Sequence, residues 1–140
     1  MDAGAGRRHD RALDLLERAL RGQIGFLTLQ ALGEFFVVTT RKFSVPIADA
    51  DRFIESWVTE FDIASAGLPE LREASAACRL HGLQFWDAML WAAARSGGAS
   101  YLISEDLQDG RVLGGVRFIN PFNPANDSDI DRLLPARSKQ

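Results

Sequence analysis

Three acidic side chains stand in largely apolar stretches of the sequence, and together they could hold a metal ion. Asp87 lies near the start of the apolar run at residues 85–94, and Asp106 follows the short run at residues 101–103. Glu34 is flanked by leucine, phenylalanine and valine. An ionised carboxylate among hydrocarbon costs roughly 2 to 5 kcal/mol unless a partner compensates it. Because a cation is such a partner, these residues predict a metal site.

The predicted cation is Mg²⁺ or Mn²⁺, because carboxylate oxygens are the ligands that hard divalent cations prefer. Such a cation removes the repulsion between converging carboxylates, binds phosphate oxygens and activates water. Each acid also has a simpler interpretation. Glu34 could be an exposed helical glutamate, and Asp87 could be a charge that favours a helix N-terminus by less than about 1 kcal/mol.

Other chemistries have less support in the sequence. The only histidines, His9 and His81, are too far apart to form a local zinc pair, and Cys78 is the only cysteine. Cys78 is interpreted as a small apolar group packed in a helix, in a reducing compartment. No glycine-rich nucleotide loop or serine-nucleophile pattern occurs. Three tryptophans at helical apolar spacing are interpreted as core rather than as base-stacking platforms: Trp57, Trp86 and Trp91.

The composition is that of one soluble globular domain. The 140 residues are 46% hydrophobic and 25% charged, with a net charge of −3 that does not suit a duplex-DNA binder. Residues 1–42 hold seven basic and five acidic groups, either on solvated helix faces or as a rim that contacts phosphate. Arg41 and Lys42 are the candidate substrate contacts of that rim. No export signal or membrane-spanning run is found, so the expected location is the cytoplasm.

Hydrophobic periodicity and turn residues predict strands that alternate with helices. The run Val37–Thr40 favours a strand, but the length and basic end of its segment favour a helix, which we choose. The predicted helices span residues 10–21, 29–42, 50–61, 68–80 and 85–95. The predicted strands span residues 24–28, 101–103 and 116–119, with a glycine-rich loop at 109–115.

This alternation predicts an α/β domain of three layers around a parallel sheet. Ligands of such sheets bind beyond the carboxyl ends of the strands, where Glu34, Asp87 and Asp106 are expected to converge. The domain is expected to occupy residues 1–122. Residues 123–140 form a polar tail that is either frayed or contains one short helix around residues 130–134.

Four motifs in order resemble the PIN-domain proteins of the VapC toxin type over about residues 8–122. They are LGEFFVV at 32–38 with TRK at 40–42, FWDAML at 85–90 with AAA at 92–94, YLISEDL at 101–107, and GVRFINPF at 115–122. The resemblance implies a PIN-like three-layer α/β/α fold and a Mg²⁺- or Mn²⁺-dependent endoribonuclease. It also implies the toxin of a type II toxin–antitoxin system, a homodimer held by a cognate antitoxin, with Glu34, Asp87 and Asp106 as metal-site acids.

One departure from that family concerns its first, central strand, which ends in a metal-binding aspartate. This sequence begins after the position of that strand, so neighbouring strand edges are expected to lack a partner. Either the true start lies upstream or the protein is degenerate. Residues 1–140 are therefore expected to bind the cation weakly and to cleave little RNA. The alternatives are a catalytically impaired remnant that binds antitoxin or dimerises, and a different Mg²⁺-dependent phosphoryl-transfer enzyme.

Overall fold

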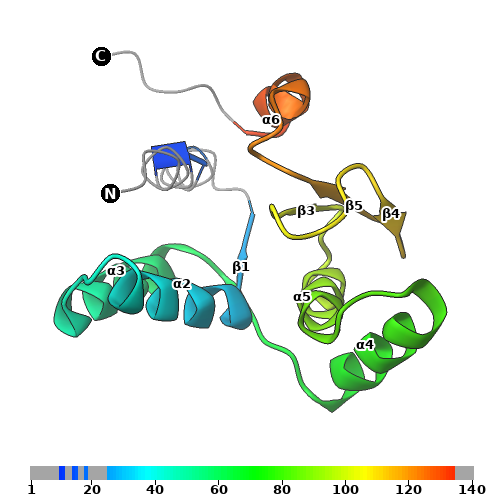
Figure 1. Cartoon of the computed structure of the whole chain (residues 1–140), viewed down its shortest axis with the longest axis horizontal. Coiled ribbons are helices and arrows are strands. Elements are labelled where there is room, and N and C mark those ends of the chain that lie inside the picture. Colours follow the sequence, from blue (N-terminus) through cyan, green and yellow to red (C-terminus); the bar gives the residue numbers. More distant parts are fainter. Residues whose placement is uncertain (1–9, 12–13, 16–17, 19–24, 135–140) are drawn as a thin grey trace. The chain divides into compact units, whose positions relative to one another are not determined.

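The computed structural model describes residues 10–11, 14–15, 18 and 25–134 (Figure 1). The chain divides into two compact units. The helical unit is Phe26–Ser100, and the sheet unit combines Met1–Gly25 with Tyr101–Gln140. Position 122, where the predicted domain ends and the predicted polar tail begins, therefore lies inside the sheet unit. Each unit is described by itself below.

The helical unit holds four helices and one pair of short strands. In chain order these are β1 (Leu27–Thr28), α2 (Leu29–Arg41), α3 (Ile47–Glu60), β2 (Ile63–Ala64), α4 (Leu68–His81) and α5 (Phe85–Ser96). Strands β1 and β2 pair in parallel. Thr28 ends β1 and also caps α2, because its side-chain oxygen accepts a hydrogen bond from the N–H of Ala31 at 3.1 Å. Strand β1 therefore passes into α2 without a loop.

The structure confirms the helical choice for residues 29–42. The β-branched residues of this segment remain helical, and the hydroxyls of Thr39 and Thr40 donate back to the carbonyls of Phe35 and Phe36. This bonding within one helix satisfies side chains that otherwise favour a strand. The structure thus excludes the strand interpretation.

Other predicted boundaries in the helical unit need correction. Helix α3 begins at Ile47 rather than at residue 50, because Pro46 occupies the N-cap and its carbonyl accepts from the N–H groups of Asp49 and Ala50. The strand predicted at 24–28 is present only at Leu27–Thr28, and residue 24 lies outside the described part. Strand β2 was not predicted, because two residues are too few to show a period.

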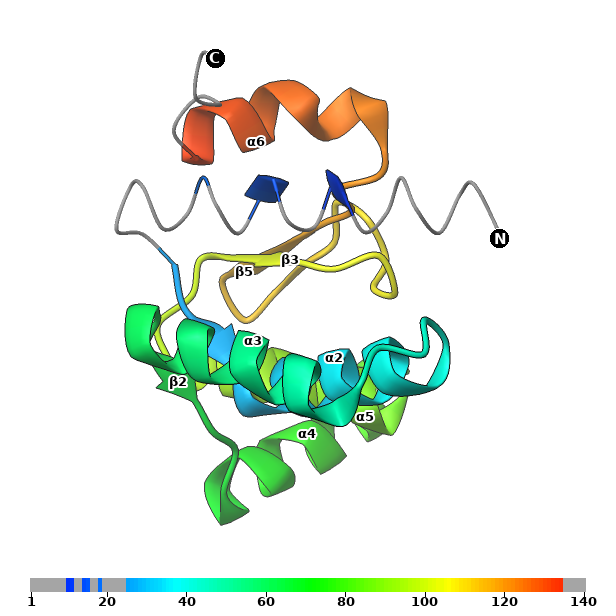
Figure 2. The ribbon, with the colours of Figure 1, turned by 90° about the vertical axis from the view of Figure 1, so that its left-hand side faces the viewer.

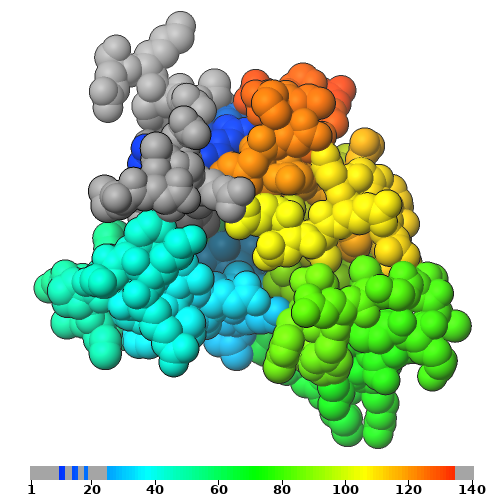
Figure 3. All heavy atoms as spheres, in the orientation of Figure 1, coloured from blue at the N-terminus to red at the C-terminus, as the bar shows by residue number. Residues whose placement is uncertain are grey.

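Helices α4 and α5 pack side by side (Figures 2 and 3). Both bury alanines, including Ala74 and Ala77 on α4 and Ala88 and Ala92 on α5. Small side chains let two helices approach closely, and polar contacts add to the packing. Arg95 pairs with Glu73, and the hydroxyl of Ser96 donates to Glu70 at 2.8 Å. These two helices match their predicted ranges to within one residue. Cys78 lies half-buried on α4, as expected for a packed thiol.

The sheet unit contains β3 (Tyr101–Ile103), β4 (Val112–Leu113), β5 (Val116–Ile119), η1 (Pro124–Asn126) and α6 (Asp127–Leu133). Strands β3 and β5 match the prediction and pair in parallel. Strand β4 was predicted as loop, and it pairs antiparallel with β5. Gly114 and Gly115 form the turn between them with φ of 54° and 80°. Glycine adopts such angles without steric cost, so a tight hairpin forms there.

Both β5 and α6 contribute side chains to the buried core of the sheet unit. Val116, Phe118 and Ile130 are fully buried. The segment after residue 122 thus contains the short helix that was one of its two predicted forms, although it starts at Asp127 rather than near residue 130. Residues 135–140 lie outside the described part.

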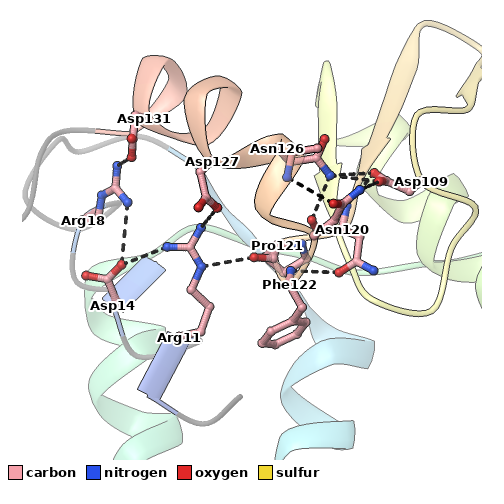
Figure 4. Close-up of polar contacts among 12 residues, drawn as sticks. Arg11, Asp14, Arg18, Asp109, Asn120, Pro121, Phe122, Asn126, Asp127 and Asp131 are labelled. Atoms are coloured by element: carbon pink, nitrogen blue, oxygen red, sulfur yellow. Dashed lines mark hydrogen bonds and ion pairs between the residues drawn. The ribbon is translucent and has the colours of Figure 1, made fainter. Parts of the chain in front are cut away.

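The described N-terminal residues are helical and bond to α6. Arg11 donates to the carbonyl of Pro121 at 3.2 Å and pairs with Asp127 at 3.3 Å. Arg18 lies 2.8 Å from Asp131 (Figure 4). Positions 10, 11, 14, 15 and 18 agree with the helix predicted at 10–21, whose other residues lie outside the described part.

The described strands form two separate sheets, β1–β2 and β3–β5–β4. The fold is therefore mixed α/β, with two parallel pairs and one antiparallel edge. The described helices include none with the length and apolar character needed to cross a membrane.

Candidate functional site

Glu34 lies on the exposed side of α2, one helical turn after Gln30. The Nε2 atom of Gln30 donates to Oε1 of Glu34 at 3.0 Å. The same nitrogen is 2.9 Å from the backbone carbonyl oxygen of Trp86 and donates to it as well. One amide therefore links the carboxylate of Glu34 to the first turn of α5.

Asp87 is the next residue in that turn and is half-buried. The N-cap residue of α5, Gln84, provides no side-chain cap. A negative charge in this first turn is favoured by the helix macrodipole. Because Gln30 joins Glu34 to the residue before Asp87, the structure brings these two predicted acids into one neighbourhood of the helical unit.

Asp106 follows β3 in the sheet unit, as the sequence predicts, but its environment differs from the prediction. The residue is exposed, and its N–H donates to the hydroxyl of Ser104 at 3.2 Å. An exposed carboxylate has no large desolvation cost, so the argument from apolar surroundings is wrong for Asp106 and for the exposed Glu34. Their neighbours in sequence are apolar, but the turn and the outer face of α2 present both side chains to water.

Three residues after Asp106, the carboxylate of Asp109 is surrounded by hydrogen-bond donors (Figure 4). The carboxylate of Asp109 accepts from the N–H of Asn120 at 3.0 Å and from Nδ2 of Asn123 at 2.8 Å. Nδ2 of Asn126 lies 2.9 and 3.0 Å from its two oxygens. These donors, with the Asn120 N–H first, hold the pKa of the Asp109 carboxyl below its ordinary value. We call this group of four residues the Asp109 cage.

Sequence reasoning missed the Asp109 cage. The available signal was three asparagines at a spacing of three, Asn120, Asn123 and Asn126, directly after a strand. Asparagine amides are donors that can surround one carboxylate. The partner in the preceding loop could not be identified from spacing alone.

Arg41 and Lys42 lie at the other end of α2 from Gln30. Arg41 is in the last turn and Lys42 is the C-cap, and both are exposed. Seven residues separate Glu34 from Arg41, which is about 10 Å along a helix axis. The structure does not place these cations beside Glu34. Their position favours the C-terminal end of the helix macrodipole.

The structure also corrects the prediction that all three tryptophans belong to the core. Trp57 and Trp91 are buried, at 9% and 5% exposure, as core residues should be, whereas Trp86 is 61% exposed. Trp86 precedes Asp87 in the first turn of α5 and lies on the outer side of that turn. Spacing alone could not separate the three tryptophans, because each recurs with apolar neighbours.

The donor set of Glu34 and Asp87 suits a hard cation. Mg²⁺ binds through one or two carboxylates, keeps several waters and completes its shell with phosphate oxygens. Within residues 10–11, 14–15, 18 and 25–134, no group of three or more histidine, cysteine, aspartate or glutamate side chains gathers to hold a metal. The predicted convergence of Asp106 with the other two acids remains a prediction.

Comparison with known proteins adds no identification. No family model matches the chain, and a search of the curated proteins gives no match.

Proposed function

We propose that this chain is a Mg²⁺- or Mn²⁺-dependent endoribonuclease of the PIN-domain, VapC toxin type. The observation that carries the proposal is the position of Gln30, whose amide lies within hydrogen-bond distance of both Glu34 and the residue before Asp87. This arrangement supports the proposal that Glu34 and Asp87, two of the three expected metal-site acids, belong to one site. Asp106 is proposed as the third acid, on the strength of its position directly after β3.

The fold supports the same proposal. The described strands include two parallel pairs, β1–β2 and β3–β5, as a mixed α/β fold of this kind requires. The finer architecture that we propose is the PIN-like three-layer α/β/α fold.

The proposed reaction is hydrolysis of an RNA phosphodiester bond. A cation bound there would supply a water of lowered pKa and would neutralise charge on the phosphate. Glu34 and Asp87 are the residues that would hold that cation, through their carboxylate oxygens. Gln30 fixes the orientation of the Glu34 carboxylate, and Arg41 and Lys42 are proposed as contacts for more distant phosphates. The proposed setting is cytoplasmic, in a homodimer held by a cognate antitoxin.

A second candidate is a catalytically impaired PIN remnant that binds antitoxin or dimerises. It is favoured by the absence of a three-acid group among the described residues. It is also favoured by exposed apolar side chains on α2 and α3, namely Val37, Val38, Ile47, Phe53 and Val58.

Metal binding and RNA cleavage separate these candidates. Calorimetric titration with Mn²⁺ is expected to give one site that Glu34→Gln and Asp87→Asn weaken, whereas the exposed α3 control Asp51→Asn leaves it unchanged. Cleavage of RNA is expected to require Mg²⁺ or Mn²⁺, to stop in EDTA and to be lost in Asp87→Asn. Cleavage that survives EDTA and Asp87→Asn contradicts the nuclease proposal. A Mn²⁺ site without cleavage of any RNA in a cellular extract favours the remnant.

A further inference from the structure

Gly97, the C-cap of α5, leaves no room for a side chain. A Cβ atom added there would lie 2.8 Å from both Cε2 and Cζ of the Phe26 ring and 3.4 Å from Cβ of Ala64. Two carbon atoms prefer a separation of about 3.5 to 4.0 Å, so the ring or the helix end would have to move. The backbone of Gly97, with φ of −77° and ψ of −1°, is in the right-handed region that ordinary residues adopt. This position therefore needs glycine for space and not for its conformation.

The contact of Phe26 with Gly97 joins the end of α5 to the segment that carries Glu34. Phe26 directly precedes β1, and β1 passes into α2 without a loop. Thr28 ends the strand and caps the helix through its bond to the N–H of Ala31. Phe26, β1 and the first turn of α2 are therefore one continuous segment.

The same segment contacts α5 a second time, at the opposite end of that helix. Nε2 of Gln30 donates to the carbonyl oxygen of Trp86, in the first turn of α5, at 2.9 Å. The 12 residues of α5 span about 18 Å. Two contacts at the two ends of a helix fix both its distance and its angle to the segment that it touches.

We infer that Gly97 and Phe26 form a positioning contact, which sets how α5 lies against the segment of β1 and α2 and so holds Asp87 in place relative to Glu34. This inference rests on the proposed function and adds two residues that act on the site only through α5. A side chain at Gly97 pushes the end of α5 away from Phe26 and tilts the helix about the Gln30 bond. Metal ligands must keep their geometry to within about 0.5 Å, so a small tilt weakens the site.

Gly97→Ala tests the contact in the full chain with two measurements, calorimetric titration with Mn²⁺ and the NMR signal of the Gln30 side-chain amide. We expect Mn²⁺ binding to weaken roughly tenfold. We also expect the Gln30 signal to shift, although the substitution is at the other end of α5. Thermal unfolding identifies a temperature at which every variant is folded, so that lost stability is not mistaken for lost affinity.

A second substitution separates the steric contact from other effects of the new methyl group. Phe26→Leu removes the two ring atoms that the added Cβ would meet. Combined with Gly97→Ala, it is expected to return the Gln30 signal and to bring Mn²⁺ affinity to within about threefold of the parent. If Gly97→Ala does not fold, Phe26→Ala replaces it, because this variant removes the contact without a clash and is expected to weaken Mn²⁺ binding roughly tenfold.

The control is Gly33→Ala, which adds the same methyl group where a Cβ would meet nothing within 4 Å, and it is expected to change neither measurement. An unchanged Gln30 signal in Gly97→Ala overturns the positioning role, whether or not the chain binds Mn²⁺. A double variant no better than Gly97→Ala overturns it as well. A Gln30 signal that shifts and is restored as expected, in a parent chain that binds no Mn²⁺, retains the positioning role and rejects the proposed function.

Discussion

At the scale of single residues, Gln30 matters more than its type suggests. An unbonded glutamate on an exposed helix face samples several rotamers, and holding it in one geometry costs side-chain entropy. Gln30 restricts Glu34 and at the same time anchors α2 to the first turn of α5. It therefore acts through Glu34, as a positioning residue for the proposed cation.

Gln30→Ala is expected to weaken Mn²⁺ binding about tenfold, because loss of a group that orients a metal ligand typically costs this much affinity. Calorimetric titration measures the change. The matched control is Gln84→Ala, which removes an exposed glutamine at the N-cap of α5 that makes no side-chain cap. Equal affinity in Gln30→Ala and Gln84→Ala would show that the bond of Gln30 to Glu34 has no role in the site.

A second residue-scale prediction concerns the pH dependence of the Asp109 cage. The cage lowers the pKa of the Asp109 carboxyl, so its stabilisation is present above the unfolded pKa of about 3.9 and is lost as the pH falls through the lower folded value. Asp109→Asn places an amide donor against the amides of Asn123 and Asn126. We expect it to reduce the free energy of unfolding by about 1 kcal/mol at pH 7, since the group is exposed.

The difference between Asp109→Asn and the parent should shrink when both are unfolded with urea near pH 3, because the carboxyl of the unfolded parent takes up a proton below about 3.9. The control is Asp62→Asn, because the described hydrogen bond of Asp62 uses its backbone carbonyl rather than its carboxylate. A difference for Asp109→Asn that is equally large near pH 3 and at pH 7 contradicts the assigned role of the carboxylate.

At the scale of elements, the N-cap of α2 connects strand pairing to the site. Thr28→Ala removes the oxygen that accepts from the N–H of Ala31, and this buried cap is expected to contribute about 1 kcal/mol. Thr28→Ser keeps the oxygen and should recover most of the loss. Thermal unfolding of the two variants measures the difference. A Thr28→Ser variant as unstable as Thr28→Ala would assign the effect to the lost methyl group instead.

The elements show what the sequence could predict and why. Helices α2, α4 and α5 and strands β3 and β5 were predicted closely, because each has enough residues to show a period or a clear terminus. Strands β2 and β4 have two residues each, so they are defined by their partners, β1 and β5, and not by their own pattern. The exposure of Trp86 was not predicted, and neither was the hydrogen bond from Gln30 to the carbonyl of Trp86, 56 residues further along the chain. Both depend on how the helices pack, which the sequence pattern does not show.

At the scale of the whole molecule, the chain ends belong to one compact unit and residues 26–100 to the other. Charged side chains join the described residues of the two ends, because Arg11 pairs with Asp127 and Arg18 with Asp131. The side chain of Arg18 is 2% exposed and lies 2.8 Å from the carboxylate of the exposed Asp131. Burial of the guanidinium makes its partners important, because an incompletely paired buried charge is costly. The described N-terminal residues therefore stabilise α6.

This linkage predicts where a substitution in α6 should act. Asp131→Asn removes one charge partner of Arg18, and we expect a loss of about 1 kcal/mol, the lower range for a charged hydrogen bond because Asp131 is exposed. Amide hydrogen exchange in α6, such as at the N–H of Leu134 bonded to Ile130, should accelerate about fivefold. Amides of α4 and α5 should keep their rates, because compact units can open separately. The control is Ser128→Ala, an exposed position on the same helix. Equal acceleration in α4, α5 and α6 would show instead that the two units open as one.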